Sequence, residues 1–131
     1  MLRRRDLVSR LVNWIDHDAV GPNVAFARDL AQLWGRLFGT PRAIDGVVAA
    51  TCDRAESRLG LSIPAPLRQF YQLLGRNRIA MGAHMRFRKP GDLEVERGGL
   101  VFCEENQRVY VSAVRVDLLN QADPPVVQGN D

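Results

Sequence analysis

The chain has 131 residues, of which 46% are hydrophobic, 25% charged and 7% aromatic, a length and composition that indicate one folded globular domain and exclude a disordered chain. Its net charge of +3 hides a split, because residues 1–91 hold 15 Lys and Arg against 7 Asp and Glu, whereas residues 92–131 hold 3 against 8. A basic front and an acidic remainder are not expected of a uniform nucleic-acid binder.

Two further features bear on the cellular compartment. No apolar stretch approaches the roughly 18 residues that a membrane span needs, and the basic N-terminus is not followed by the apolar run of a signal peptide. Cys52 and Cys103 both lie among apolar residues, which predicts buried free thiols in a reducing compartment. We therefore expect a cytoplasmic protein.

The front of the chain has the spacing of amphipathic helices. Apolar residues recur three and four positions apart in four stretches, at 7–15, 26–37, 44–59 and 67–74. Glycine follows each of the last three, at Gly39, Gly60 and Gly75. Thr40-Pro41 predicts the start of the third helix, as an N-cap followed by a first-turn proline.

From residue 76 onward the periodicity changes. Residues 76–84 are predicted as a loop, and 117–121 as a short helical turn. Alternating or β-branched runs predict short strands at 85–88, 93–96, 100–103, 108–114 and 126–127. Gly98-Gly99 predicts the turn of a hairpin. Helices followed by strands predict an α+β fold, with N-terminal helices packed on a mixed, mostly antiparallel β-sheet.

No group of residues in the sequence predicts catalysis. Asp16-His17-Asp18 are contiguous and would point three ways from a helix, so they are interpreted as a polar helix end and not as a metal site. His84 is interpreted as a loop histidine. The chain lacks Gly-x-Ser-x-Gly and the glycine spacing of a phosphate-binding loop. We therefore expect no enzyme activity, no metal and no cofactor.

Basic side chains surround one predicted strand, together with Phe87: Arg76, Arg78, Arg86, Arg88 and Lys89. In a nucleic-acid site the arginines would contact phosphates and Phe87 would stack on a base. Strand alternation favours another interpretation, in which Phe87 enters the core while Arg86 and Arg88 are solvated. Nucleic-acid binding is thus the less favoured alternative, and salt-dependent binding would reveal it.

Acidic residues are the stronger indication of a binding surface. They fall on predicted turns and strand exteriors, at Asp92, Glu94, Glu96, Glu104, Glu105, Asp117, Asp123 and Asp131. Gathered on one side, they would form a negative patch that steers a basic partner. Solvation and protection of edge strands would explain each residue singly as well.

Three segments in order carry a family resemblance. Ala55–Tyr71 (AESRLGLSIPAPLRQFY) places Leu-Gly and a hydrophobic-Pro step between two helices, Leu100–Gln107 (LVFCEENQ) is a strand ending in Glu-Asn-Gln, and Asp123–Val126 reads DPPV. This order resembles the SUKH superfamily of fungal cell-wall regulators and bacterial toxin-immunity proteins. The resemblance covers residues 41–131, so we expect a single SUKH-like domain over 1–131, with 1–40 as a helical extension.

The sequence departs from this pattern in two places. Ser112 stands where many relatives carry Trp. The sequence ends soon after Asp-Pro-Pro-Val, whereas relatives usually continue with further strands and a C-terminal helix. Either this copy is naturally short at its C-terminus, or the sequence is cut from a longer one, or another chain completes the sheet; a second copy doing so would make it a homo-oligomer.

The resemblance implies a non-catalytic protein-binding domain, and foremost a bacterial immunity protein that binds and blocks a cognate toxin of nuclease or deaminase type. Such a partner is expected to be a basic toxin domain, which makes Glu104, Glu105 and Asp123 the predicted partner-binding residues. The alternative is a regulatory or scaffolding interaction domain without a toxin partner. The neighbouring gene would distinguish the two.

Overall fold

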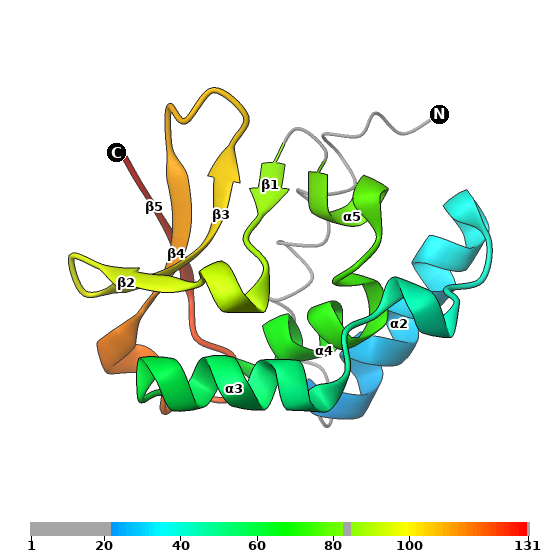
Figure 1. Ribbon diagram of the computed structural model, residues 1–131, viewed down its shortest axis with the longest axis horizontal. Helices are drawn as coiled ribbons and strands as arrows, with labels where there is room; N and C mark the ends of the chain where they lie inside the picture. Colours follow the sequence, from blue (N-terminus) through cyan, green and yellow to red (C-terminus); the bar gives the residue numbers. More distant parts are fainter. Residues whose placement is uncertain (1–21, 83–84, 131) are drawn as a thin grey trace.

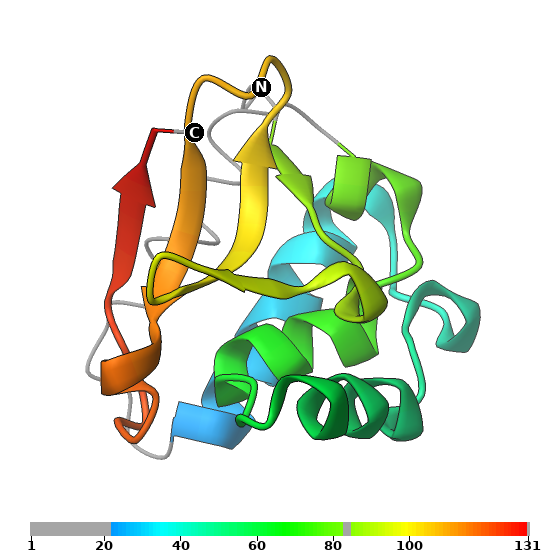
Figure 2. The same cartoon turned by 60° about the vertical axis from the view of Figure 1, so that its left-hand side comes forward.

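The computed structural model describes residues 22–82 and 85–130. Its first part is helical and its second part forms one antiparallel sheet, which confirms the predicted α+β fold. The described helices gather on one side of the sheet (Figures 1 and 2). The predicted helix at 7–15 and the cluster Asp16-His17-Asp18 lie outside the described residues, as does His84.

The helical layer follows the apolar periodicity closely in two places. Its elements are α2 (Pro22–Phe38), η1 (Ala43–Asp45), α3 (Ala49–Leu59), α4 (Ala65–Leu74) and α5 (Arg78–Gly82). Leu30 and Trp34 of α2 are buried as the spacing predicts. In α4 the whole predicted stripe is buried, at Leu67, Phe70, Tyr71 and Leu74. Within this layer, Arg68 of α4 is linked to α3 by ion pairs with Asp53 and Glu56.

The predicted start of the third helix at Thr40-Pro41 is wrong, because α3 begins only at Ala49. The preceding residues bond to the end of α4 instead: Val47 N–H donates to the carbonyl of Tyr71 at 3.0 Å. Gly46 is extended and lies so close to α4 that a Cβ there would sit 1.7 Å from the carbonyl oxygen of Gln72. The apolar residues Ile44 and Val48 are consequently 64% and 68% exposed.

The predicted loop at 76–84 also needs correction, because it contains the short helix α5. The Asn77 side chain starts this helix by accepting hydrogen bonds from the N–H groups of Ile79 and Ala80, at 3.0 and 3.1 Å. Ala80 is buried against the core.

The sheet has five strands: β1 (Met85–Phe87), β2 (Glu94–Glu96), β3 (Gly99–Glu105), β4 (Val111–Arg115) and β5 (Val126–Gly129). The strand order is β1-β3-β4-β5, and β2 also pairs with β3. β1 pairs with the last residues of β3 and β2 with the first, so both line one side of this central strand. β5 forms the other edge of the described sheet.

The strand boundaries differ slightly from those predicted. The turn between β2 and β3 consists of Arg97 and Gly98, with φ of 49° and 79°, as in a two-residue hairpin turn; the predicted turn was one residue too late. β3 continues through Glu105, and β4 begins at Val111 instead of Arg108. The predicted helical turn at 117–121 is the 3-10 turn η3 (Val116–Leu118).

A β-bulge interrupts β3. Val101 is opposite Ala113, but Cys103 is opposite Ser112, so Phe102 is the extra residue. Phe102 and Cys103 both join the hydrophobic core between sheet and helices. Cys52 and Cys103 are free and fully buried, which confirms the prediction of buried thiols.

Candidate functional site

The sheet has a face turned away from the helical core, which we call the outer sheet face. Residues opposite each other in an antiparallel pair point to the same side of a sheet. The strand register therefore defines three rows on this face: Arg86, Glu104, Val111 and Gly129; Glu94, Val101, Ala113 and Val127; Glu96, Gly99 and Arg115.

A shallow hollow of about 450 Å³ lies on the outer sheet face. Its floor is apolar and includes the small residues Gly99 and Ala113. These two residues lie close together, since a Cβ on Gly99 would be only 3.1 Å from that of Ala113. Val101 in the floor is buried, whereas Val127 is 38% exposed. Charged side chains, Glu96, Arg97 and Arg115, stand around it.

The predicted residue Glu104 lies on the outer sheet face, within an ion-pair network. Its carboxylate lies 3.6 Å from the Arg88 guanidinium and 3.9 Å from that of Arg108. Arg88 also pairs with Glu96 at 3.7 Å. The expectation of a solvated Arg88 is therefore wrong, because its side chain is only 19% exposed. By contrast Arg86 is exposed, as predicted.

The other two predicted residues lie elsewhere. Glu105 faces the core side opposite Met85 and is 6% exposed. Its carboxylate accepts hydrogen bonds from Gln107 N–H at 2.9 Å and Val109 N–H at 3.4 Å, closing the β3–β4 loop. Asp123 is half-buried and precedes β5 at the opposite end of the sheet. The three carboxylates therefore form no common patch, and their role in partner binding stays a prediction.

The acidic excess of residues 92–131 is partly neutralised within the fold. Besides the pairs of Glu96 and Glu104, Asp117 pairs with Arg115 at 2.5 Å. Within the described part of the chain, Asp92 and Glu94 have no ion-pair partner. Asp131 lies outside the described residues. The outer sheet face is thus mixed in charge, with apolar floor and charged margin.

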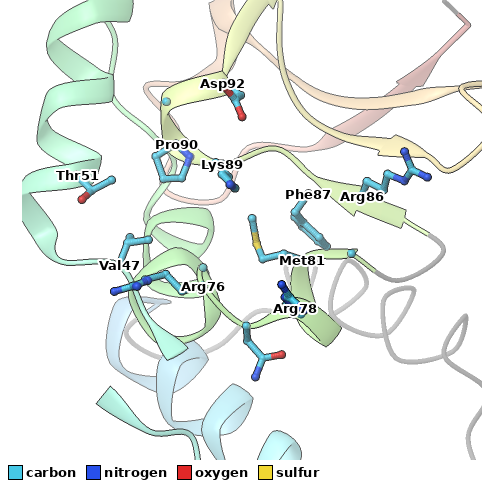
Figure 3. Close-up of a pocket in the computed structure, with 14 residues that line it drawn as sticks. Val47, Thr51, Arg76, Arg78, Met81, Arg86, Phe87, Lys89, Pro90 and Asp92 are labelled. Atoms are coloured by element: carbon cyan, nitrogen blue, oxygen red, sulfur yellow. The ribbon is translucent and has the colours of Figure 1, made fainter. Parts of the chain in front are cut away.

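A second concave feature, the basic cleft, has a volume of about 740 Å³ and lies between α3, α5 and the segment that follows β1 (Figure 3). Its charged lining residues are Arg76, Arg78, Arg86, Lys89 and Asp92; the others are Val47, Thr51, Gly75, Asn77, Met81, Gly82, Phe87, Pro90 and Gly91. In Figure 3 the Arg86 side chain points away from the other labelled basic side chains.

Hydrogen bonds hold one wall of the basic cleft. The Asp45 carboxylate accepts from Arg42 N–H at 2.8 Å and from the Asn77 side-chain amide at 3.4 Å. The Asp45 carbonyl accepts from Arg76 N–H at 2.8 Å. The bond from Arg42 N–H holds the pKa of Asp45 below its ordinary value. Asp45 thereby fixes the segment that carries Arg76 and leads into α5, which begins at Arg78.

Aromatic packing holds the other wall. The Phe87 ring centroid lies 4.5 Å from that of Phe70 and 6.1 Å from that of Phe102. This confirms that Phe87 enters the core, as strand alternation predicted. The sequence predicts the local cluster of basic residues but not the cleft, because its pattern predicts a loop where the helix α5 lies. Asn77, a good N-cap residue, was the signal that could have revealed this helix.

The described residues contain no group of three or more His, Cys, Asp and Glu side chains placed to hold a metal ion. Burial raises the pKa of the Cys103 thiol to about 12 and also raises that of Cys52, so neither thiol is an activated nucleophile. Among the described helices, none combines the length and apolar character of a membrane span.

Comparison of the chain with protein-family models, curated proteins and solved structures gives no match. The SUKH-like motifs therefore remain a resemblance of residues, which bears on function only as a proposal.

Proposed function

We propose that this protein is a non-catalytic protein-binding domain, an immunity protein that binds a cognate toxin of nuclease or deaminase type and blocks its active site. The outer sheet face is the proposed contact surface. Two arguments support this: the three SUKH-like segments in the sequence, and the form of that face.

The hollow on the outer sheet face is the observation that carries the proposal. Protein interfaces combine an apolar, desolvated centre with a polar and charged margin. Val127, which is 38% exposed, is the accessible apolar side chain at the centre, with the buried residues Val101 and Ala113 beside it in the floor, and the charged side chains stand around it. Within the described residues, β5 is an edge strand of the sheet, and an edge strand is a place where a partner strand can pair.

Charge favours a basic partner at two positions. Glu94 is exposed and lacks an ion-pair partner among the described residues. Glu104 pairs with Arg108 at 3.9 Å, and the Arg108 side chain is 70% exposed. Because the Arg108 end of this long pair is exposed, a basic side chain of a partner can replace Arg108 at small cost.

The experiment first reads the neighbouring genes, then co-expresses the chain with any toxin domain they encode and measures both protection of the cells and binding of the purified proteins. We expect Val127→Arg and Glu94→Arg to weaken binding at least about tenfold, because one inserts a charge into the apolar centre and the other reverses a complementary charge. Val48→Arg is the matched control, since Val48 is 68% exposed on the helical layer.

Each result bears on a different part of the proposal. Protection that the two outer-face variants lose and the control keeps would support it. Absence of any binding or protection with that toxin domain would refute the immunity function. Binding without protection would favour the alternative, a regulatory or scaffolding interaction domain.

A further inference from the structure

We propose that the basic cleft binds a small organic phosphate of nucleotide size. Arg76, Arg78 and Lys89 would hold the phosphate groups, and the apolar surface of Met81 and Phe87 would hold the organic part. This site is distinct from the outer sheet face and does not depend on the proposed immunity function.

The first argument is charge. The lining of the cleft carries four basic side chains and one acidic side chain, Asp92. Elsewhere in the described structure basic residues near acids pair with them, as Arg68, Arg88 and Arg115 do. Within the same described part, Arg76, Arg78 and Lys89 have no ion-pair partner. Like charges gathered in a concave site produce a positive potential that attracts anions.

The second argument is shape. A cleft of about 740 Å³ falls within the size range of small-molecule sites, roughly 300–1,000 Å³. Its walls are held in place beforehand, one by the bonds of Asp45 and the other by the packing of Phe87 on Phe70. A prearranged site loses less conformational entropy when a ligand binds.

The third argument distinguishes a small phosphate ligand from a nucleic-acid strand. A strand needs a basic groove that follows its backbone over several nucleotides. Beyond the cleft this surface does not stay basic, because Arg88 is paired with Glu96 and Glu104. Glu94 adds an acidic group on β2, and Asp92 contributes one in the cleft lining itself. The guanidinium groups of arginine match the geometry of both carboxylate and phosphate oxygens, and several basic side chains together suit the higher charge of a phosphate.

The test measures binding of ATP, GTP and inorganic triphosphate to the full chain by titration calorimetry, without divalent cations. We expect at least one nucleotide to bind with a Kd below about 1 mM, and triphosphate to bind more weakly because it lacks the organic part. Arg78→Glu and Lys89→Glu should each weaken nucleotide binding at least about tenfold, since each removes a charge-assisted hydrogen bond and adds repulsion.

Matched variants separate the parts of the proposal. Arg36→Glu makes the same charge change on an exposed position of α2 and should alter the Kd less than about twofold. Met81→Gln should weaken nucleotide binding but leave triphosphate binding unchanged. The proposal is overturned if neither nucleotide binds, if Arg36→Glu matters as much as Lys89→Glu, or if a single-stranded oligonucleotide binds more tightly than either nucleotide at equal salt.

Discussion

The Tyr71 hydroxyl donates a hydrogen bond to the backbone carbonyl of Arg88 at 2.5 Å. Tyr71 belongs to α4 and is fully buried, whereas Arg88 directly follows β1. The N–H of Arg88 is also engaged, donating to the carbonyl of Phe102 at 2.8 Å. One peptide segment is thus fastened to the helical layer on one side and to β3 on the other, which sets the distance between the two layers.

Replacing Tyr71 with Phe removes this bond and keeps the ring. We expect the free energy of unfolding to fall by about 1–3 kcal/mol, because the carbonyl of Arg88 loses its partner in a buried setting. Urea denaturation followed by circular dichroism measures this. Tyr110→Phe is the control, since the Tyr110 hydroxyl has only a 3.5 Å contact with the Met85 sulfur. Equal losses in both variants would contradict the role given to Tyr71.

Substitution of Gly46 should be among the most damaging changes in the chain. In Gly46→Ala the new Cβ would lie 1.7 Å from the Gln72 carbonyl oxygen, which is backbone and cannot rotate away. The segment before α3 must then move away from α4, and we expect the free energy of unfolding to fall by at least about 3 kcal/mol. Gly35→Ala provides the comparison, because nothing lies within 4 Å of its Cβ in α2. The free energy of unfolding of that variant should rise by about 0.5–1 kcal/mol, because alanine has a higher helix propensity than glycine.

Asp45 should make stability depend on pH in the acidic range. Its pKa in the folded protein is lowered, chiefly by the hydrogen bond from Arg42 N–H. A lowered pKa contributes stability that is present above the unfolded value, about 3.9, and is lost as pH falls through the folded value. Asp45→Asn keeps an acceptor for Arg42 N–H but does not titrate.

Thermal unfolding between pH 3 and pH 7 should therefore show the wild-type melting temperature above that of Asp45→Asn near neutrality. The difference should narrow below about pH 4, because there the unfolded chain takes up a proton at Asp45 and, at still lower pH, the folded protein does so too. A difference that stays constant over this range would show that the charge of Asp45 contributes no pH-dependent stability.

The two cysteines should be inert in the folded protein. Both are fully buried, and burial raises the pKa of the Cys103 thiol to about 12. At pH 8 an aromatic disulfide reagent should modify them only when the chain unfolds, so denaturant should speed the reaction by orders of magnitude. Ser57→Cys supplies an exposed thiol as the control, and it should react at once. Rapid modification of the wild type would contradict the buried environment.

The sequence predicted best those elements whose signals are local. α4 has two prolines at its start, a glycine after it and an apolar stripe in between, and all three agree with the structure. The segment before α3 had comparable local signals at Thr40-Pro41, Ile44 and Val48. The contact of Gly46 with Gln72 overrides them, and no local pattern reveals a contact between residues so far apart in the chain.

The candidate site was predictable to a smaller degree for the same reason. Glu104 was expected at a surface and does lie on the outer sheet face. Its pairing with Arg88 depends on β1 lying beside β3, which the sequence does not show. Glu105 was expected at the surface too, but the loop after β3 uses its carboxylate to satisfy backbone N–H groups. The basic cleft depends on α5, which was missed.

The bulge at Phe102 also determines to which face of the sheet each later residue of β3 points. With strict alternation from Val101 outward, Cys103 would share its face, Glu104 would point to the core and Glu105 to solvent. The extra residue reverses this order, so that Cys103 packs inside, Glu104 meets Arg88 outside and Glu105 closes the loop. Deleting Phe102 would leave regular alternation in which both glutamates keep their present faces. The bulge therefore lets a strand one residue longer present the same charge to a partner.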